Sequence, residues 1–455
     1  MLHVVLRLQE AGRQAYLVGG KLRDALSGER AAAADGSPAG SVDWDVATAA
    51  RPDEVQRLFA RTVPIGIEHG TVRVLQDEHA VEVTTFRADL STDGRRAVVR
   101  FSDDLLEDLA RRDFTINALA LDPARGELID PHGGAADLRA RVLRPVGDAH
   151  ARFAEDFLRI FRGARFAARF GLEVPPEVRE AMRARAAGTA RLSGERVREE
   201  IQKTLAQAEL PSVAFRLLHE TGVLAHVLPE LEACFGVEQN RWHADDVGTH
   251  ILLVLDAVPR RFPFLRLVAL LHDIGKPGAK VWEPSRDDWV FRGHDELGAE
   301  LARGCLERLR FPRREAERAV HLIRVHMDLF PLEAGDAAVR RWLQRVGEEN
   351  VGDLFRLHFA DWRGNRAKPR PALELRALYR RARAVASERH ALRITDLAIG
   401  GADLKELGLA PGPEFRRILE ALLQRVLEDP AANQRGELLE HARRLARTGA
   451  ASARP

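Results

Sequence analysis

Cysteine is almost absent from this 455-residue chain. Only Cys234 and Cys305 are present and no C-x-x-C pair occurs, which excludes a zinc site built on cysteine pairs. Long apolar runs are also missing: the most apolar stretch, residues 264–271, is too short to span a membrane and contains Arg266. The first ten residues, MLHVVLRLQE, lack the apolar core of a signal peptide. Because few cysteines fit a reducing compartment, we expect a cytoplasmic protein.

Neither sign of charge predominates. Lys and Arg number 70 against 68 Asp and Glu, so the net charge of +2 indicates no class of partner. Locally, residues 159–203 contain eleven basic and six acidic side chains. Such a cluster on helical sequence suits contact with a nucleic-acid backbone, but a solvated helical face explains it equally well.

Hydrophobic patterns divide the chain into unlike parts. Strand and helix signals mix in the first third, whereas helical periodicity takes over from residue 149 onward. Residues 31–40, AAAADGSPAG, are of low complexity and predict a loop insertion. Strands are predicted at residues 15–19, 42–47, 71–75, 81–86 and 118–121, and helices at 2–11 and 52–60. We expect a small α/β head (1–148), a helical neck (149–236), a helical body (237–368) and a helical tail (369–455).

The head carries two acidic residues suited to Mg²⁺. Asp43 and Asp45 are one residue apart on a predicted strand, so their side chains project from the same face. Carboxylates in this arrangement can hold Mg²⁺ against a nucleotide triphosphate. Just upstream, the run YLVGGKLRD offers backbone N–H groups at Gly20 and a cation at Arg23 for phosphate oxygens. Each fragment alone is more often an ordinary turn, but their order favours a nucleotidyl-transfer site.

Two later motifs add charged groups to this picture. In RRDFTINA, the adjacent Arg111 and Arg112 can bind the charged triphosphate. Asp113 and Asn117 can bind ribose hydroxyls or support the metal site. A basic turn ahead of a strand is the alternative interpretation of this motif.

The run RFAEDFLRIFRGARFAARF (152–170) predicts one continuous helix. On such a helix Asp156, Arg159 and Arg162 share about a third of the circumference, and Arg165 lies on the far side. The alternative to a binding role is an ion pair within the helix between Asp156 and Arg159.

The motifs GGKLRD, DWD, RRDFTINA, DPHGG and ED-x-x-R occur in an order and spacing that resemble the class II tRNA nucleotidyltransferases, the CCA-adding enzymes, and their bacterial poly(A) polymerase relatives. The resemblance covers about residues 15–205. It implies an α+β chain whose head has a polymerase-β-like nucleotidyltransferase fold with a mixed sheet, followed by an all-α neck, body and tail. It further implies that Mg²⁺ binds Asp43 and Asp45, that the triphosphate region contacts Gly20, Arg23 and Arg112, and that Asp156 and Arg159 template the base with Arg162 and Arg165 nearby.

Hydrogen-bond chemistry is consistent with such a template. Cytosine and adenine both present an exocyclic amine beside a ring-nitrogen acceptor, which match a carboxylate and a guanidinium. Uracil and guanine present a carbonyl and a ring N–H instead, so buried groups would be left unpaired. Residues 86–101 stand where the family has a flexible loop needed for adding A; the segment is only slightly short, which favours A addition.

A second group of metal-ligand types lies in the body. The run LVALLHDIGKP contains His272 and Asp273 at the end of an apolar stretch. Imidazole together with carboxylate suits a transition metal such as Ni²⁺, Co²⁺, Mn²⁺ or Zn²⁺ rather than Ca²⁺, and such a metal activates water toward phosphate esters. Any single histidine is more often an ordinary core or surface residue.

The adjacent His-Asp followed by Gly-Lys resembles the HD-domain phosphohydrolase superfamily, whose pattern is H…HD…D. The resemblance implies phosphatase or 2′,3′-cyclic phosphodiesterase activity with Ni²⁺, Co²⁺ or Mn²⁺. His243 and His321 are left without a role. The implied metal ligands are His250, His272, Asp273 and Asp361, with His294 and His326 binding a second metal or the substrate.

The favoured function is a CTP/ATP:tRNA nucleotidyltransferase that builds or repairs the 3′-terminal CCA, with tRNA, ATP and CTP as partners and no membrane. Within the same family, an enzyme that adds only A, or a poly(A) polymerase, is the alternative. A different class, an HD phosphohydrolase with a non-catalytic tRNA-binding head, is disfavoured because Asp45, Arg112 and Asp156 are intact. The oligomeric state is not indicated.

Overall fold

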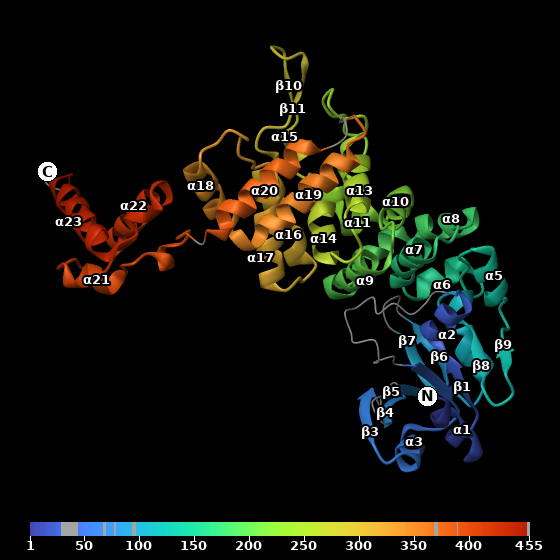
Figure 1. Cartoon of the computed structure of the whole chain (residues 1–455). Coiled ribbons are helices and arrows are strands. Elements are labelled where there is room, and N and C mark those ends of the chain that lie inside the picture. Colours follow the sequence, from blue (N-terminus) through green and yellow to red (C-terminus); the bar gives the residue numbers. More distant parts are fainter. Residues whose placement is uncertain are drawn as a thin grey trace.

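The computed structural model describes residues 1–28, 44–66, 70–76, 79–92, 97–367, 372–388 and 390–452. Figure 1 shows an elongated molecule with the mixed-sheet head at one end and the last three helices at the other. The expected fold class, an α+β head followed by a mostly helical chain, is confirmed. Asp43 and the 31–40 insertion lie outside the described residues.

The head is built on a seven-stranded sheet with the order β3-β4-β5-β2-β1-β8-β9. Its interior strand β2 (Trp44–Thr48) pairs in parallel with β5 and antiparallel with β1, where Asp45 lies opposite Val18. Val46 has no exposed surface, as expected of an apolar residue on an interior strand. The other strands of the sheet are β1 (Ala15–Val18), β3 (Thr62–Gly66), β4 (Thr71–Gln76), β5 (His79–Thr85), β8 (Ala120–Asp122) and β9 (Glu127–Ile129).

The strand predictions hold at four of the five places, and the fifth is displaced. The predicted strand at 118–121 is observed as β8, Ala120–Asp122, because the preceding Thr115–Asn117 form a 3₁₀ turn. A separate two-stranded sheet of β6 (Arg87–Thr92) and β7 (Ala97–Phe101) was not predicted.

Amphipathic helices cover the sheet. On α1 (Leu2–Glu10), Val4, Val5 and Leu8 are buried at helical spacing against the strands. α3 (Pro52–Leu58) begins with proline in its first turn, where a missing N–H costs no hydrogen bond. The remaining head helices are α2 (Gly19–Leu26), α4 (Leu105–Ala110) and α5 (Gly134–Ala140).

The neck and body share one hydrophobic core, which runs from Phe114 in the head to Ala386 in α20. Arg266, buried in this region, donates to the carbonyl oxygens of Leu205 and Ala208 at the end of α9 and so joins body to neck. The predicted domain boundaries stay predictions. The helices are α6 (Ala149–Glu155), α7 (Leu158–Phe170), α8 (Pro176–Arg185), α9 (Gly194–Gln207), α10 (Ser212–Glu220), α11 (Leu224–Val227), α12 (Pro229–Glu232), α13 (Val247–Ala257), α14 (Pro263–Leu271), α15 (Lys276–Ala279), α16 (His294–Arg308), α17 (Arg313–Arg324), α18 (Asp336–Val346), α19 (Val351–Gly364) and α20 (Leu373–Ser387).

The tail has its own small core, formed by α21 (Gly401–Glu406), α22 (Pro413–Glu428) and α23 (Arg435–Ser452). Arg340 on α18 donates to the carbonyl oxygens of Leu427 and Glu428, which ties the end of α22 to the body. In the described part of the chain, no helix combines the length and the apolar character that a membrane span requires.

Candidate functional site

Asp45 lies on β2 directly against the turn that follows β1. The ideal Cβ position of Gly19 overlaps the Asp45 carboxylate, and Gly19 has a φ of +82°. Both facts call for glycine, which alone adopts this conformation freely and leaves room for the carboxylate. Of the predicted acidic pair, only Asp45 lies within the described residues. Its carboxylate lies beside the first residue of α2.

Arg23 on α2 is turned into the protein. It is 4% exposed, its guanidinium lies 4.4 Å from the ring centroid of Phe170, and it donates to Asn117 at 2.5 Å and to Asp24. Asp24 in turn accepts from Arg169 at 2.8 Å. Arg23 thus joins the head to α7, and its predicted contact with phosphate stays a prediction.

A chain of hydrogen bonds continues from Arg23 to the neck. Asn117 donates to Asp113 at 2.9 Å, and Arg162 on α7 donates to the other oxygen of Asp113 at 2.7 Å. Burial alone would raise the pKa of Asp113, but Arg162 and Asn117 outweigh it and lower the value to about 2. Arg112 donates to the carbonyl oxygen of Asn117 at 3.1 Å. The RRDFTINA motif therefore links the head to α7 through ionised, paired groups.

The expectation of one continuous helix through residues 152–170 is wrong. α6 ends at Glu155 and α7 begins at Leu158, with Asp156 between them in an extended conformation (φ −153°, ψ 107°). Asp156 accepts from the backbone N–H of Leu158 at 3.0 Å and from Arg196 at 2.7 Å. An aspartate that bonds the first N–H groups of a helix favours a break at that point.

The alternative interpretation, an ion pair between Asp156 and Arg159, is not found among the described contacts. Arg159 pairs with Glu155 instead and donates to the carbonyl oxygen of Arg111 at 3.2 Å. Asp156 still lies within electrostatic reach of Arg162, whose pKa is raised mainly by Asp113 and also by Asp156.

Arg165 bonds neither Asp113 nor Asp156 among the described contacts, and its predicted place near the base stays a prediction. It forms a buried ion pair with Glu200 on α9 at 2.6 Å. Glu200 and Arg196 escaped the sequence analysis, although their spacing of four residues puts them on one face of α9. From this one helix, Glu200 pairs with Arg165 and Arg196 donates to Asp156.

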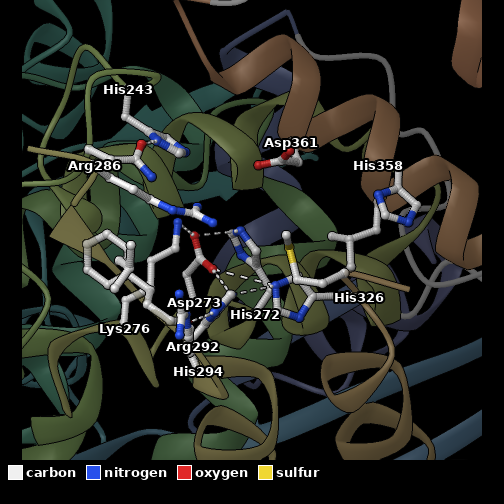
Figure 2. A pocket seen from close by; sticks show the side chains of 15 residues that line it. His243, His272, Asp273, Lys276, Arg286, Arg292, His294, His326, His358 and Asp361 are labelled. Carbon is white, nitrogen blue, oxygen red and sulfur yellow. Dashed lines mark hydrogen bonds and ion pairs between the residues drawn. The ribbon is translucent and has the colours of Figure 1, made fainter. Parts of the chain in front are cut away.

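The second site gathers six side chains from five helical regions, with Asp273 at their centre. Figure 2 shows the rings of His272, His294 and His326 converging on this carboxylate. The Nε2 atoms of these three histidines lie 3.2, 3.5 and 3.6 Å from its oxygens. His250 on α13 lies 3.5 Å from Asp273 and 3.0 Å from Asp361 on α19. All six residues predicted from sequence are brought together, and their roles as ligands stay predictions.

Backbone contacts fix which ring nitrogen of each histidine is free. The Nδ1 atoms of His272, His294 and His326 donate to carbonyl oxygens three residues earlier, at 2.8, 2.6 and 2.6 Å. Nε2 of each ring is then the atom with a lone pair. The Nε2 atoms of His294 and His326 are 3.3 Å apart, and Nε2 of His272 is buried without a hydrogen bond among the described residues. Facing lone pairs and an orphaned buried acceptor fit a bound cation.

Asp273 lies at the centre of the site and contacts four of its histidines. Burial opposes its charge, but His272 and Lys276 outweigh burial and hold its pKa well below the usual range. Lys276 lies 2.7 Å from one of its oxygens. Two groups with metal-ligand spacing share this carboxylate: His250, His272 and Asp273, and Asp273, His294 and His326.

The cluster opens into a pocket of about 330 Å³. His243, which the sequence left without a role, lies in this pocket with its ring 5.2 Å from that of His250. His321 is instead bonded to the carbonyl oxygen of Val346 at 2.7 Å, a structural contact. Three cations that line the pocket were not assigned from sequence: Lys276, Arg286 and Arg292.

Three known domain families match the chain. The poly A polymerase head domain matches residues 15–144, a probable RNA- and SrmB-binding site of polymerase A matches residues 171–235, and the HD domain matches residues 261–396.

Curated relatives cover most of the chain. The multifunctional CCA protein of Xanthomonas campestris pv. campestris (strain B100) is 36% identical over 414 residues, which span 87% of this chain and 95% of that protein. The CCA-adding enzyme of Geobacillus sp. (strain WCH70) is 41% identical over 322 residues, 66% of this chain and 75% of that protein. Among solved structures, the Bacillus stearothermophilus CCA-adding enzyme in complex with CTP superposes with a TM-score of 0.74 and 28% identity, covering 99% of this chain and 98% of that one.

Proposed function

The chain belongs to the CCA-adding enzyme family and is a nucleotidyltransferase, and we propose that it builds or repairs the 3′-terminal CCA of tRNA from CTP and ATP. The observation that carries this proposal is the hydrogen-bonded path from Arg23 through Asn117 and Asp113 to Arg162. It joins the predicted phosphate-binding turn to the predicted base-reading helix. The CTP complex of the Bacillus stearothermophilus enzyme and the tRNA complex of the Thermotoga maritima enzyme support these partners.

Divalent metal use follows from the nucleotidyltransferase and HD domains. In the head, Asp43 and Asp45 are the proposed Mg²⁺ ligands, and the missing side chain of Gly19 lets the Asp45 carboxylate lie against the Gly-Gly turn. Bound Mg²⁺ neutralises phosphate charge and stabilises the attacking and leaving oxygens of an in-line displacement. Gly20 at the start of α2 offers its backbone N–H to the triphosphate, and Arg112 supplies a cation.

The proposed base-reading pair is Asp156 and Arg159. Asp156 accepts from the exocyclic amine of cytosine or adenine, and Arg159 donates to the adjacent ring nitrogen. Arg196 and Glu155 hold these two side chains, so the pair is oriented before the nucleotide arrives. Uracil and guanine meet like groups at both positions and are rejected.

For the HD site we propose phosphatase or 2′,3′-cyclic phosphodiesterase activity. The free Nε2 atoms of His272, His294 and His326 favour Ni²⁺, Co²⁺ or Mn²⁺ as the metal. When bound, such an ion polarises phosphate oxygens and lowers the pKa of water. Lys276 holds one oxygen of Asp273 in place, while the pocket above is wide enough for a phosphate ester.

Matched variants of the two sites test both proposals. Asp45→Asn is expected to abolish nucleotide addition and leave metal-dependent hydrolysis of bis-p-nitrophenyl phosphate intact. Asp273→Asn is expected to do the reverse. If Asp45→Asn removed hydrolysis, or Asp273→Asn removed addition, the assignment of the two reactions to separate sites would be wrong.

A further inference from the structure

The outer wall of the HD pocket carries aromatic and basic groups that the proposed hydrolysis does not use. This wall, here called the rim, consists of the loop 240–243 and the hairpin of β10 (Val281–Glu283) and β11 (Asp288–Val290) with its flanking Arg292. Figure 1 shows the hairpin projecting from the body. The loop contributes Asn240 and His243 to the pocket, and the hairpin region contributes Arg286 and Arg292.

Trp242 stands on this loop with its side chain in solvent. The residue is 68% exposed, although the residues on either side of it are anchored. Arg241 pairs with Asp288 at 2.9 Å and donates to the carbonyl oxygen of Arg286 at 2.6 Å. Asn365 at the end of α19 donates to the carbonyl oxygen of Trp242 at 2.9 Å. The backbone is fixed while the indole is free, so an aromatic ligand can stack on it at little entropic cost.

The rim also carries two arginines that share a single acidic partner. Arg286 and Arg292 both pair with Glu283, at 3.3 and 3.0 Å, so two guanidinium groups share one carboxylate. All of these contacts are exposed to solvent, where an ion pair contributes little free energy. The two arginines can therefore exchange Glu283 for a phosphate, which guanidinium binds with two parallel hydrogen bonds.

We propose that the rim binds the end of a single-stranded RNA, with a base stacked on Trp242 and a backbone phosphate held by Arg286 and Arg292. The inference rests on the proposed phosphohydrolase activity, because it delivers the terminal phosphate of that strand to the cluster around Asp273. An exposed aromatic ring, on a loop that is bonded to a hairpin with two arginines, is a combination suited to single-stranded nucleic acid without regard to sequence. A free mononucleotide carries no second phosphate and gains less from the rim.

Hydrolysis kinetics on three substrates test the proposal: a hexaribonucleotide with a 2′,3′-cyclic end, free 2′,3′-cyclic CMP, and bis-p-nitrophenyl phosphate. Trp242→Ala is expected to raise KM for the hexanucleotide about tenfold, with kcat and the bis-p-nitrophenyl phosphate rate unchanged. Trp242→Phe, which keeps an aromatic ring, is expected to keep KM for the hexanucleotide close to that of the unchanged protein. Arg286→Gln and Arg292→Gln are each expected to lower the slope of log KM against log salt concentration for the hexanucleotide by about one.

Trp282→Ala is the matched control. Trp282 is also exposed, at 44%, and lies on the same hairpin, but it does not line the HD pocket. It lines a neighbouring hollow, which shares Val290 and Arg292 with that pocket. Its replacement is expected to leave KM for the hexanucleotide unchanged. An equal effect of both tryptophan variants, or none of Trp242→Ala, on an active enzyme contradicts the proposal.

Photo-crosslinking separates this inference from the activity on which it rests. A hexanucleotide with 4-thiouridine next to a 3′-phosphate end is irradiated with the full-length protein, and the crosslinked peptides are mapped. A crosslink in the peptide that contains Trp242, lost in Trp242→Ala while crosslinks to the head persist, supports the rim even if no ester is hydrolysed. Crosslinks confined to the head contradict it, even if hydrolysis is normal.

Discussion

The two sites of this chain differ in how their charged and polar groups are paired. In the head and neck, Arg23, Arg162 and Arg165 each have an acidic partner, so charge is balanced within the protein. In the HD site, the Nε2 atoms of His294 and His326 lie 3.3 Å apart, and a bound cation would relieve the repulsion between their lone pairs. The first arrangement is suited to orienting the groups proposed to recognise a substrate, and the second is suited to binding the proposed metal.

Metal removal gives the largest expected difference between the sites. After chelation, hydrolysis at the HD site should fall at least a thousandfold and return with Ni²⁺, Co²⁺ or Mn²⁺ but not with Ca²⁺. Nucleotide addition should return with Mg²⁺. Rates measured on the same chelated sample check this, and hydrolysis that survives chelation would show that the cluster is not a metal site.

Base selectivity in the head should depend on single side chains. Asp156→Ala is expected to reduce the preference for CTP over UTP about a hundredfold, because the exocyclic amine loses its acceptor. Ratios of kcat/KM for the four nucleotides measure the effect. Glu180→Ala, an exposed acidic residue of α8, is the control. Equal loss of activity with all four nucleotides would refute the template role.

The charge balance of the head can be tested through pH. The folded pKa of Asp113 is about 2 against an ordinary 3.8, so its ionised form contributes about 2 kcal/mol of stability above pH 3.8. This contribution is lost as pH falls toward 2. The Tm difference between the protein and Asp113→Asn should therefore be large at pH 6 and shrink below pH 4. A difference independent of pH would indicate that the carboxylate acts through packing rather than charge.

A smaller effect is expected at Arg196, which holds one oxygen of Asp156. Arg196→Gln should reduce the CTP over UTP preference about tenfold, less than loss of Asp156 itself, because the carboxylate remains but is less well oriented. The neighbouring Arg198 donates to the carbonyl oxygen of Arg310 between α16 and α17, and Arg198→Gln serves as control. If Arg196→Gln left selectivity unchanged while Asp156→Ala removed it, the positioning contact would be unimportant.

Local sequence signals predicted what depends on local physics. The interior strand of Asp45 follows from its apolar run, and the first helix follows from its helical periodicity. The break at Asp156 was missed because the apolar pattern continues on both sides, and only the side-chain bond to Leu158 ends the first helix.

Contacts made only by the tertiary structure were not predictable. The residues of the HD cluster were predicted to lie together because the family resemblance named them. Their spacing in the sequence does not by itself place them together. Arg286 and Trp242 of the rim carried no comparable signal, since the loop and the hairpin meet only through Arg241. The partnership of Arg196 with Asp156 is likewise a contact between two separate helices.

The most direct test of the account follows the products on tRNA. Transcripts that end in the discriminator base, in C and in CC are incubated with CTP, ATP, UTP or GTP separately and with CTP and ATP together. We expect CTP to add two nucleotides to the first transcript and one to the second, ATP to add a single A after CC, and UTP and GTP to add nothing. Extension by all four nucleotides, or long A tracts from ATP alone, would contradict the reading of the base by Asp156 and Arg159.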